Sequence, residues 1–276
     1  MIPSRFLIGV DSDGTAFDSM NHKHLDALIP AALEVWRMER EVANRFTEIY
    51  KSVNLYSATR GINRFPGLLE VFERLKKEYP NGKNLPELDM LREYVNENSR
   101  YSTASLQDWM IEHPSSELSK VLAWSIRANV IIARACEGIL PYEGVIEALA
   151  EAGEKATVAV VSAAVKEELE KDWIFAGLMS HVDVMMGQED GFKPEQLQRA
   201  IDLSGADYVL MIGDAEMDAE AARAVDGMFY PIVPGKEAEC WQTFRDEVLP
   251  MFLKGQYGKE EEAKYYEPMK AMLKEE

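Results

Sequence analysis

Hydrophobic and polar positions follow two different patterns along the chain. The run from Phe6 to Val10 is continuously apolar and ends at an aspartate, which is typical of a short strand buried on both faces. From about Met20 to Cys136 the apolar residues recur at helical spacing, and no convincing strand interrupts them. The helices expected there lie within residues 25–36, 41–53, 66–79, 87–98 and 115–136. This region is therefore predicted to be all-helical.

Beyond residue 137, short apolar runs alternate with helical patterns. The strands are expected within residues 157–164, 182–187, 208–214 and 228–234, and the helices within residues 144–153, 167–177, 194–205 and 217–227. Strands that alternate with helices pair in parallel through right-handed crossovers. The sequence therefore predicts an α/β fold with a doubly wound parallel sheet, to which the strand at Phe6–Val10 also belongs.

A length of 276 residues suits roughly two domains of about 150 residues each. We expect a core domain from residues 1–16 and 137–250, with an all-helical domain, residues 17–136, inserted after the first strand. Residues 251–276 are rich in charge and are expected to form a charged C-terminal helix or tail on the solvated surface.

The composition excludes several classes of partner. Thirty Lys and Arg against 48 Asp and Glu leave a net charge of −18, which repels nucleic acid and anionic membranes. The first apolar run is too short for a secretory signal, and no run is long enough for a membrane span. Cys136 and Cys240 are far apart and indicate neither a disulfide framework nor a zinc site. A cytoplasmic location is the simplest expectation.

Polar residues follow several of the expected strands, and the carboxyl ends of parallel strands lie along one edge of a sheet. We therefore expect a site there from Asp11, Asp13, Ser162, Lys193, Asp214 and Asp218. Carboxylates that converge without His or Cys suit a hard cation such as Mg2+. A carboxylate can also attack phosphorus to form an aspartyl-phosphate, and a second can move the proton. Gly14 would let the backbone turn so that nearby amides face the phosphate.

Four short motifs carry a family resemblance. "DSDGT" at residues 11–15, a strand that ends in Ser162, "FKP" around Lys193 and "GDAEMD" at residues 213–218 resemble, in order and spacing, the motifs of the haloacid dehalogenase-like (HAD) hydrolase superfamily. The resemblance covers about residues 5–16 and 137–235. It implies a HAD-like Rossmannoid core, and the helical insertion looks like the C1-type cap of that superfamily.

The resemblance also implies a role for each motif residue. Asp11 matches the nucleophile and Asp13 the acid/base residue, and both match metal ligands, Asp13 through its backbone carbonyl. Ser162 and Lys193 match the phosphate-binding pair, with which we group Gly14 and Thr15. Asp214 matches the acidic metal ligand, and Asp218 matches a supporting acid.

Asp13 separates branches of the superfamily, because dehalogenases resemble this chain in their nucleophilic Asp but lack an acid two residues later. Its presence favours phosphoryl transfer. Two features depart from the family pattern. "VSAA" around Ser162 lacks the Asn that many members have after the Ser or Thr, and the insertion is longer than a minimal four-helix cap.

Other polar residues allow two interpretations. Arg60 and Arg64, in the loop "SATRGINRF" at residues 57–65, either reach the substrate or belong to a helix connector with solvated arginines, and we weigh the connector more heavily. His22 and His24 either contact the substrate or, as we favour, lie on the surface. His113 and His181 show no partner pattern, and the five tryptophans are expected to pack among apolar neighbours.

The sequence thus predicts a Mg2+-dependent phosphatase that hydrolyses a small phosphorylated metabolite, with a cap that opens and closes over the site. A phosphomutase of the same superfamily and a non-catalytic phosphate-binding regulatory protein are the alternatives. The sequence indicates neither the particular substrate nor the oligomeric state.

Overall fold

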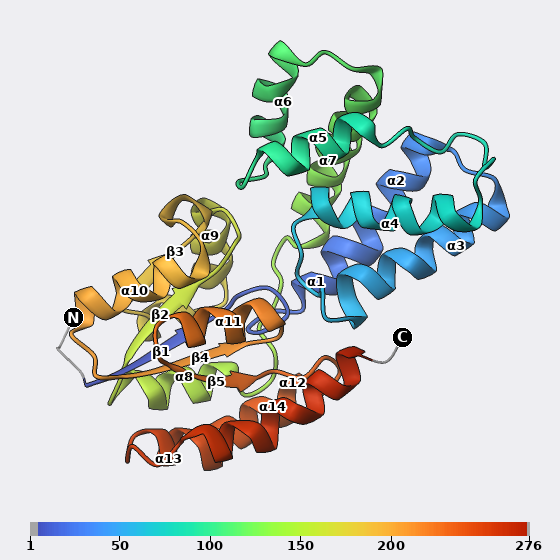
Figure 1. The fold of residues 1–276 in the computed structure, drawn as a ribbon. Coiled ribbons are helices and arrows are strands. Elements are labelled where there is room, and N and C mark those ends of the chain that lie inside the picture. The colour runs from blue at the N-terminus through green and yellow to red at the C-terminus, as the bar shows by residue number, and fades with distance from the viewer. Residues whose placement is uncertain (1–4, 275–276) are drawn as a thin grey trace. The chain divides into compact units, whose positions relative to one another are not determined.

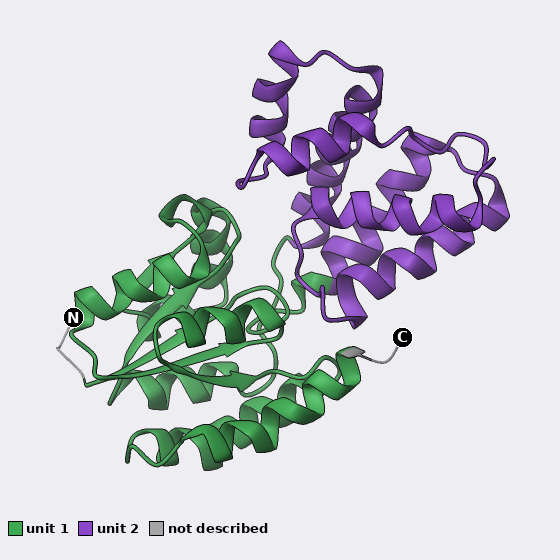
Figure 2. Ribbon diagram, in the orientation of Figure 1, with its two compact units in different colours: residues 1–20, 137–274 green, residues 21–136, 275–276 purple. Residues whose placement is uncertain are grey.

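A computed structural model describes residues 5–274 (Figure 1). The chain divides into two compact units (Figure 2). The first contains the residues up to Met20 together with Glu137–Lys274, and the second contains Asn21–Cys136. The second unit is thus inserted into the first, between two strands of its sheet.

The first unit is built on a five-stranded sheet whose strands are all parallel. Its strands are β1 (Phe6–Val10), β2 (Thr157–Val161), β3 (Val184–Met186), β4 (Tyr208–Gly213) and β5 (Met228–Pro231), in the order β3-β2-β1-β4-β5. β1 lies at the centre, with Val10 opposite Val160 on one side and Ile212 on the other. The predicted doubly wound parallel sheet is confirmed.

Helices cover both faces of this sheet, which is why its strands are apolar on both sides. On one face, residues such as Ile8 pack with α8 (Val145–Gly153), α9 (Lys166–Phe175), α12 (Glu237–Thr243) and the segment η5 (Phe244–Val248) with α13 (Leu249–Phe252). On the other, residues such as Leu7 pack with α10 (Lys193–Ser204), α11 (Glu216–Ala224) and α14 (Lys259–Lys274). Short 3-10 turns, η3 (Leu178–His181) and η4 (Gln188–Asp190), flank β3.

The charge-rich C-terminal stretch forms α14, whose described residues are not all solvated. Tyr266, Met269 and Leu273 are buried against the sheet. Glu262 accepts a hydrogen bond of 2.8 Å from the backbone N–H of Phe229 on β5. One apolar stripe on a charged helix is enough to anchor it. Residues 275 and 276 of the expected tail lie outside the described residues.

The second unit, Asn21–Cys136, is helical, as expected for the insertion. It contains η1 (His22–Leu28), α2 (Ile29–Trp36), α3 (Arg40–Lys51), η2 (Ser52–Tyr56), α4 (Arg64–Glu78), α5 (Asp89–Glu97), α6 (Thr103–Glu112) and α7 (Ser116–Ala135), and the short α1 (Ser19–Asn21) leads into it. The segments η1 and η2 are π-helical. The sequence analysis did not anticipate α6, which buries little apolar surface and begins with a capping box between Ser102 and Ser105.

The helical unit has its own hydrophobic core, in which aromatic side chains interlock. The ring centroid of Trp36 lies 4.9 Å from that of Phe72 and 6.3 Å from that of Trp124. The indole N–H of Trp124 donates a hydrogen bond of 3.0 Å to the backbone oxygen of Leu28, so α7 is joined to the end of η1. A buried tryptophan thereby keeps its polar atom satisfied.

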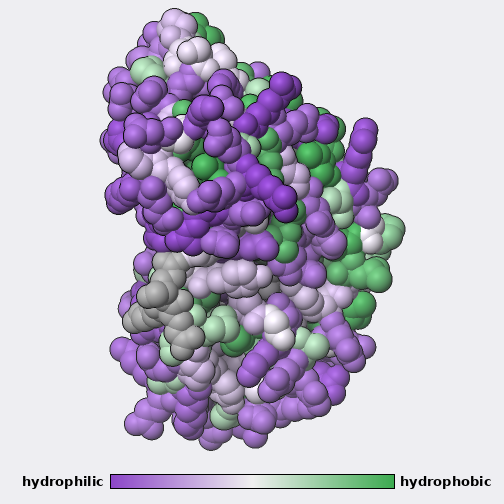
Figure 3. All heavy atoms as spheres, turned by 90° about the vertical axis from the view of Figure 1, so that its right-hand side faces the viewer, coloured by the Kyte–Doolittle hydropathy of each residue, from purple (hydrophilic) through white to green (hydrophobic). Residues whose placement is uncertain are grey.

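The surface is largely polar. Hydrophilic residues predominate on the face in Figure 3, where hydrophobic residues form separate groups. Within residues 5–274, no helix is both long enough and apolar enough to cross a bilayer.

We expect Met269→Ala to destabilise the first unit by about 2–5 kcal/mol, because the truncation leaves a cavity between α14 and the sheet. Urea unfolding measures the loss. Lys264→Ala, at an exposed position on the same helix, is the matched control and should change stability little. Equal stability of the two variants would show that α14 adds nothing to the core.

Candidate active site

The carboxyl ends of β1 and β4 bring the motif residues to one edge of the sheet. Asp11 directly follows β1 and Asp214 directly follows β4. The N–H of Asp11 donates a hydrogen bond of 3.0 Å to the backbone oxygen of Ile212, so the strand pairing continues to the aspartate itself. Lys193 begins α10 and Asp218 lies in the first turn of α11. Residues about 200 positions apart in the chain therefore meet.

Lys193 is the centre of this group. Its Nζ lies 2.9 Å from Asp11 Oδ2 and 2.6 Å from Asp218 Oδ1. All three residues are buried, and one carboxylate oxygen from each of Asp11, Asp214 and Asp218 lies within 4.8 Å of the other two. Three buried carboxylates against one lysine leave an excess of negative charge, which a cation would offset.

Asp218 is held on both of its oxygens. Oδ1 accepts from Lys193, and Oδ2 accepts a hydrogen bond of 3.1 Å from the backbone N–H of Ala215 at the start of α11. Gly213 makes room for this carboxylate, because a Cβ at that position would lie 2.2 Å from Asp218 Cγ. Asp218 is thus a partner of Lys193 and of the first turn of α11.

The pKa of Asp11 is raised to about 8, mainly by burial and also by the carboxylates of Asp218 and Asp214, while Lys193 opposes the shift. Burial also raises the pKa of Asp218, against the effect of Lys193. Burial disfavours the charge of Lys193, but Asp11 and Asp218 outweigh that effect, so the pKa of the lysine is raised. The lysine therefore stays protonated, and the carboxylates are the groups that titrate.

The loop that carries the two aspartates is held by two tryptophans. Trp173 on α9 donates from its indole N–H to Ser12 Oγ at 3.0 Å, and Trp241 on α12 donates to the backbone oxygen of Thr15 at 2.9 Å. Both indoles are buried. They were expected only to pack, because a single chain gives no sign that an indole N–H points at a loop. The loop is thus fixed from two helices on the same face of the sheet.

Gly14 and Thr15 form hydrogen bonds that shape the loop after β1. Gly14 has φ +76°, and its N–H donates a hydrogen bond of 2.8 Å to the backbone oxygen of Phe17. The expected turn is present, but the amide of Gly14 is used inside it. The hydroxyl of Thr15 donates to Asp214 Oδ1 at 2.9 Å, so this side chain orients an acid of the site.

Asp13 stands apart from the buried carboxylates. It is half-buried, and the hydroxyl of Ser19 donates a hydrogen bond to its Oδ1. Its side chain is not among the three whose oxygens converge within 4.8 Å. A carboxylate that is partly accessible and accepts a hydrogen bond from a hydroxyl is suited to exchange a proton. Ser19, six residues after Asp13, carried no signal in the sequence.

Ser162 lies just beyond β2, next to β1 in the sheet, and is buried. Its Oγ accepts a hydrogen bond of 3.2 Å from the N–H of Ala164. Gln196 on α10, which the sequence analysis missed, donates to the backbone oxygens of Ser162, Gly187 and Gly191 at 2.7–2.9 Å. This buried amide ties together the loops that follow β2 and β3.

Two expectations for the helical unit were wrong. Arg60 is not a solvated arginine, because it is buried and its Nη1 donates to the backbone oxygen of Leu55 at 2.8 Å. His24 is not a surface residue, because it lies on the buried face of η1 with its ring 5.8 Å from that of Tyr50. Arg64 donates to Asn129 Oδ1 at 2.6 Å, and His22 pairs with Asp26 at 2.8 Å.

The comparison with family models gives a match to the haloacid dehalogenase-like hydrolase over residues 7–226, which include the whole set of motifs. The chain belongs to this family. No curated protein matches the hydrolase.

Solved structures resemble this hydrolase in fold at low sequence identity. A predicted phosphoglycolate phosphatase from Haemophilus somnus has a TM-score of 0.54 at 16% identity, over 87% of this chain and 92% of that one. A protein from Clostridium difficile, whose phosphatase assignment is itself a prediction, has a TM-score of 0.51 at 13% identity, over 84% and 86%. These likenesses support the fold of the hydrolase.

We expect the metal-free hydrolase to lose stability as the pH rises from about 4 towards 8. Because the pKa of Asp11 is raised in the folded protein, this group binds a proton over more of the range than in the unfolded chain, where it ionises near its ordinary pKa of 3.8. Thermal unfolding of the EDTA-treated protein measures the slope. In Asp11→Asn the slope should be flatter and the Tm near pH 8 higher, by about 2–4 °C for each 1 kcal/mol gained. The exposed Asp202→Asn is the control, and a slope in Asp11→Asn equal to that of the native protein would contradict the expectation.

We expect Gly213→Ala to break the contact between Lys193 and Asp218, because the new Cβ would occupy the place of the carboxylate. Loss of a buried ion pair costs about 3–5 kcal/mol. Chemical denaturation measures this loss. Gly258→Ala is the control, since a Cβ there lies 3.6 Å from its nearest neighbour, Glu261 Oε2. Similar stabilities of both variants would show that Asp218 can move without loss.

Proposed function

We propose that this hydrolase is a Mg2+-dependent phosphatase that acts on a small phosphorylated metabolite, with Asp11 as the nucleophile. The observation that carries the proposal is the buried Lys193, held 2.9 Å from Asp11 and 2.6 Å from Asp218. A lysine against the attacking carboxylate supplies positive charge where phosphoryl oxygens would lie. The second aspartate, Asp13, can supply a proton. Its presence therefore favours a substrate whose leaving group must be protonated, rather than one that releases a halide.

In the proposed reaction, an oxygen of Asp11 bonds to phosphorus while the bond from phosphorus to the leaving oxygen breaks. Asp13 gives its proton to that oxygen, and the product leaves as an alcohol. Asp13 then takes a proton from a water molecule, whose oxygen bonds to phosphorus as the bond to Asp11 breaks. Inorganic phosphate is released, and both aspartates return to their starting forms. The hydroxyl of Ser19 orients Asp13 for both transfers.

The described residues fit Mg2+. The donors at the site are carboxylate oxygens, which this ion prefers, and the buried set carries more negative than positive charge. Asp11 and Asp214 would hold the ion, with the backbone carbonyl of Asp13 as the family resemblance implies. When bound, Mg2+ supplies charge that reduces the repulsion between Asp11 and the phosphoryl group.

Phosphate binding is assigned to Ser162 and Lys193. Gly14 and Thr15 were grouped with them, but the hydrogen bonds of both residues support a role in shaping the loop and orienting Asp214. Contact of Arg60 and Arg64 with the substrate stays a prediction. We infer that the helical unit acts as the cap of the family, on the ground of its insertion between β1 and β2. We propose a cytoplasmic location, because the chain has only two cysteines and they indicate no disulfide framework.

The test is phosphate release from a panel of small phosphorylated metabolites, with and without Mg2+. We expect Mg2+-dependent release that is abolished in Asp11→Asn. Asp13→Asn should lose about 100- to 10,000-fold in kcat/KM on alkyl phosphates. The loss should be smaller on p-nitrophenyl phosphate, because nitrophenolate leaves without a proton and kcat/KM reports the first bond cleavage.

Asp202→Asn, on the same helix as Lys193 but exposed, is the control and should keep full activity. Full activity in Asp11→Asn, or no release from any substrate, would contradict the proposal. A long-lived phosphoenzyme that turns over only with a bisphosphate would instead indicate a phosphomutase. Binding of phosphate analogues without any turnover would indicate the regulatory alternative.

A further inference from the structure

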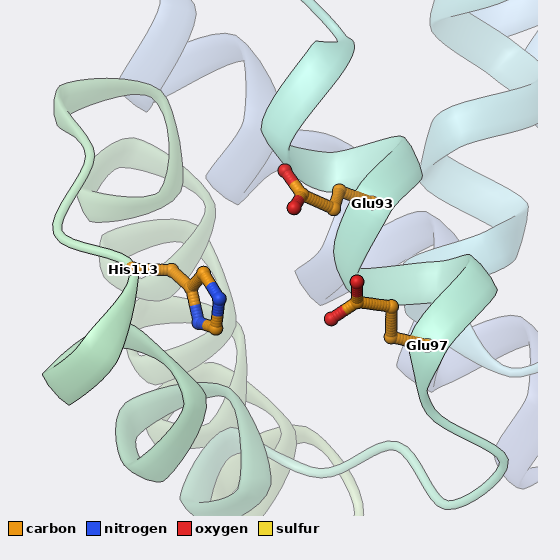
Figure 4. Close-up of side chains that lie close together, drawn as sticks. All are labelled: Glu93, Glu97 and His113. Atoms are coloured by element: carbon orange, nitrogen blue, oxygen red, sulfur yellow. The ribbon is translucent and has the colours of Figure 1, made fainter.

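A second group of metal-ligating side chains lies in the helical unit. α5 presents Glu93 and Glu97, which are four residues apart and therefore lie on one face of the helix. His113 directly follows α6. Figure 4 shows the two carboxylates and the imidazole turned toward one another from α5 and from the end of α6. One ligand atom from each lies within 4.8 Å of the other two.

These side chains converge without bonding to one another. In the described part of the chain, no hydrogen bond or ion pair joins His113 to either glutamate, and neither glutamate pairs with a lysine or arginine. The two carboxylates thus lie close together without a lysine or arginine between them. Ligands of one metal ion, each about 2.0–2.2 Å from it, are separated in this way because they bond to the ion and not to each other.

The imidazole is oriented by a group outside the ligand set. His113 Nδ1 lies 3.1 Å from the backbone oxygen of Trp109, and since a carbonyl only accepts, Nδ1 carries the hydrogen. Nε2 of the neutral ring then keeps its lone pair for a metal ion. The ring is also stacked on the indole of Trp109, with centroids 3.8 Å apart and planes at 12°. A histidine whose other nitrogen donates to a carbonyl is the usual arrangement at metal sites.

Trp109 orients a second ligand as well. Its indole N–H donates to Glu97 Oε2 at 3.3 Å. One residue of α6 therefore positions both the imidazole and one carboxylate. These contacts restrict the rotamers of His113 and Glu97 before any ion binds. Less side-chain entropy is therefore lost on binding than for two freely rotating side chains.

We propose that Glu93, Glu97 and His113 bind one divalent transition-metal ion of the Zn2+ type, with water as the remaining ligand. Two carboxylates with an imidazole suit Zn2+, whereas Mg2+ takes oxygen ligands. The net charge of −18 further favours a cation at the surface. The ion joins α5 to the end of α6, and its binding stabilises the folded helical unit. This site is independent of the proposed phosphatase chemistry.

The experiment is calorimetric titration of the full chain with Zn2+ in an excess of Mg2+, which is added to compete for the carboxylates of Asp11 and Asp214. We expect one Zn2+ per chain and a higher Tm in its presence. His113→Gln and Glu97→Gln should each weaken binding at least 100-fold and remove the gain in Tm. Trp109→Phe keeps a ring but loses the indole N–H, and should weaken binding about 10-fold.

His22→Gln is the matched control, because His22 is a partly exposed histidine of the same unit that pairs with a carboxylate, Asp26. It should bind Zn2+ as the native protein does. The Tm of each metal-free variant, compared with that of the native protein, separates loss of the site from loss of the fold. The proposal is overturned if the native protein takes up no Zn2+ under these conditions, or if His113→Gln and Glu97→Gln bind it as tightly as the native protein.

Discussion

The candidate active site depends on one buried ammonium group. Lys193 lies between Asp11 and Asp218, and removal of its charge would leave three buried carboxylates together without a positive side chain between them. Such an arrangement persists only if the surrounding backbone holds the charges in place. Three features of the backbone hold the charges in place: the position of β4 next to β1, the missing Cβ of Gly213 and the first turn of α11. The geometry of the sheet edge is therefore set by charge as much as by apolar packing.

The loop that carries Asp11 and Asp13 is fixed by hydrogen bonds from the apolar core. Trp173 and Trp241 each bury a large ring on one face of the sheet and direct the indole N–H at the loop between β1 and α1. The same side chains therefore stabilise the fold and position the aspartates. Because packing restricts both rings to one rotamer, their hydrogen bonds hold the loop in a fixed position relative to the core. Catalysis that depends on placement gains from this coupling.

The two proposed metal sites differ in the chemistry of their ligands. At the sheet edge the ligands are buried carboxylates beside a lysine, which suit a hard cation. In the helical unit an imidazole backed by a carbonyl joins two exposed glutamates, which suits a transition metal. Each unit has its own hydrophobic core, so neither site needs the other for its local geometry.

The sequence alone determined the doubly wound sheet, the helical insertion and the motif residues, because these depend on local period and on order along the chain. Apolar runs that end in Asp11, Ser162 and Asp214 predict strands and their polar ends whatever lies around them. The sequence did not reveal α6, the buried His24 and Arg60, or the contacts of Trp173, Trp241, Gln196 and Ser19. Only the tertiary structure decided these. Most are contacts between groups distant in the chain, or lie on a face whose burial depends on neighbouring helices. The contact of Ser19 with Asp13 depends on the fold of the loop between them. The pairing of Glu93 and Glu97 with His113 is of the same kind, since the spacing of the two glutamates is visible in the sequence but the imidazole reaches them only through the packing of α5 and α6.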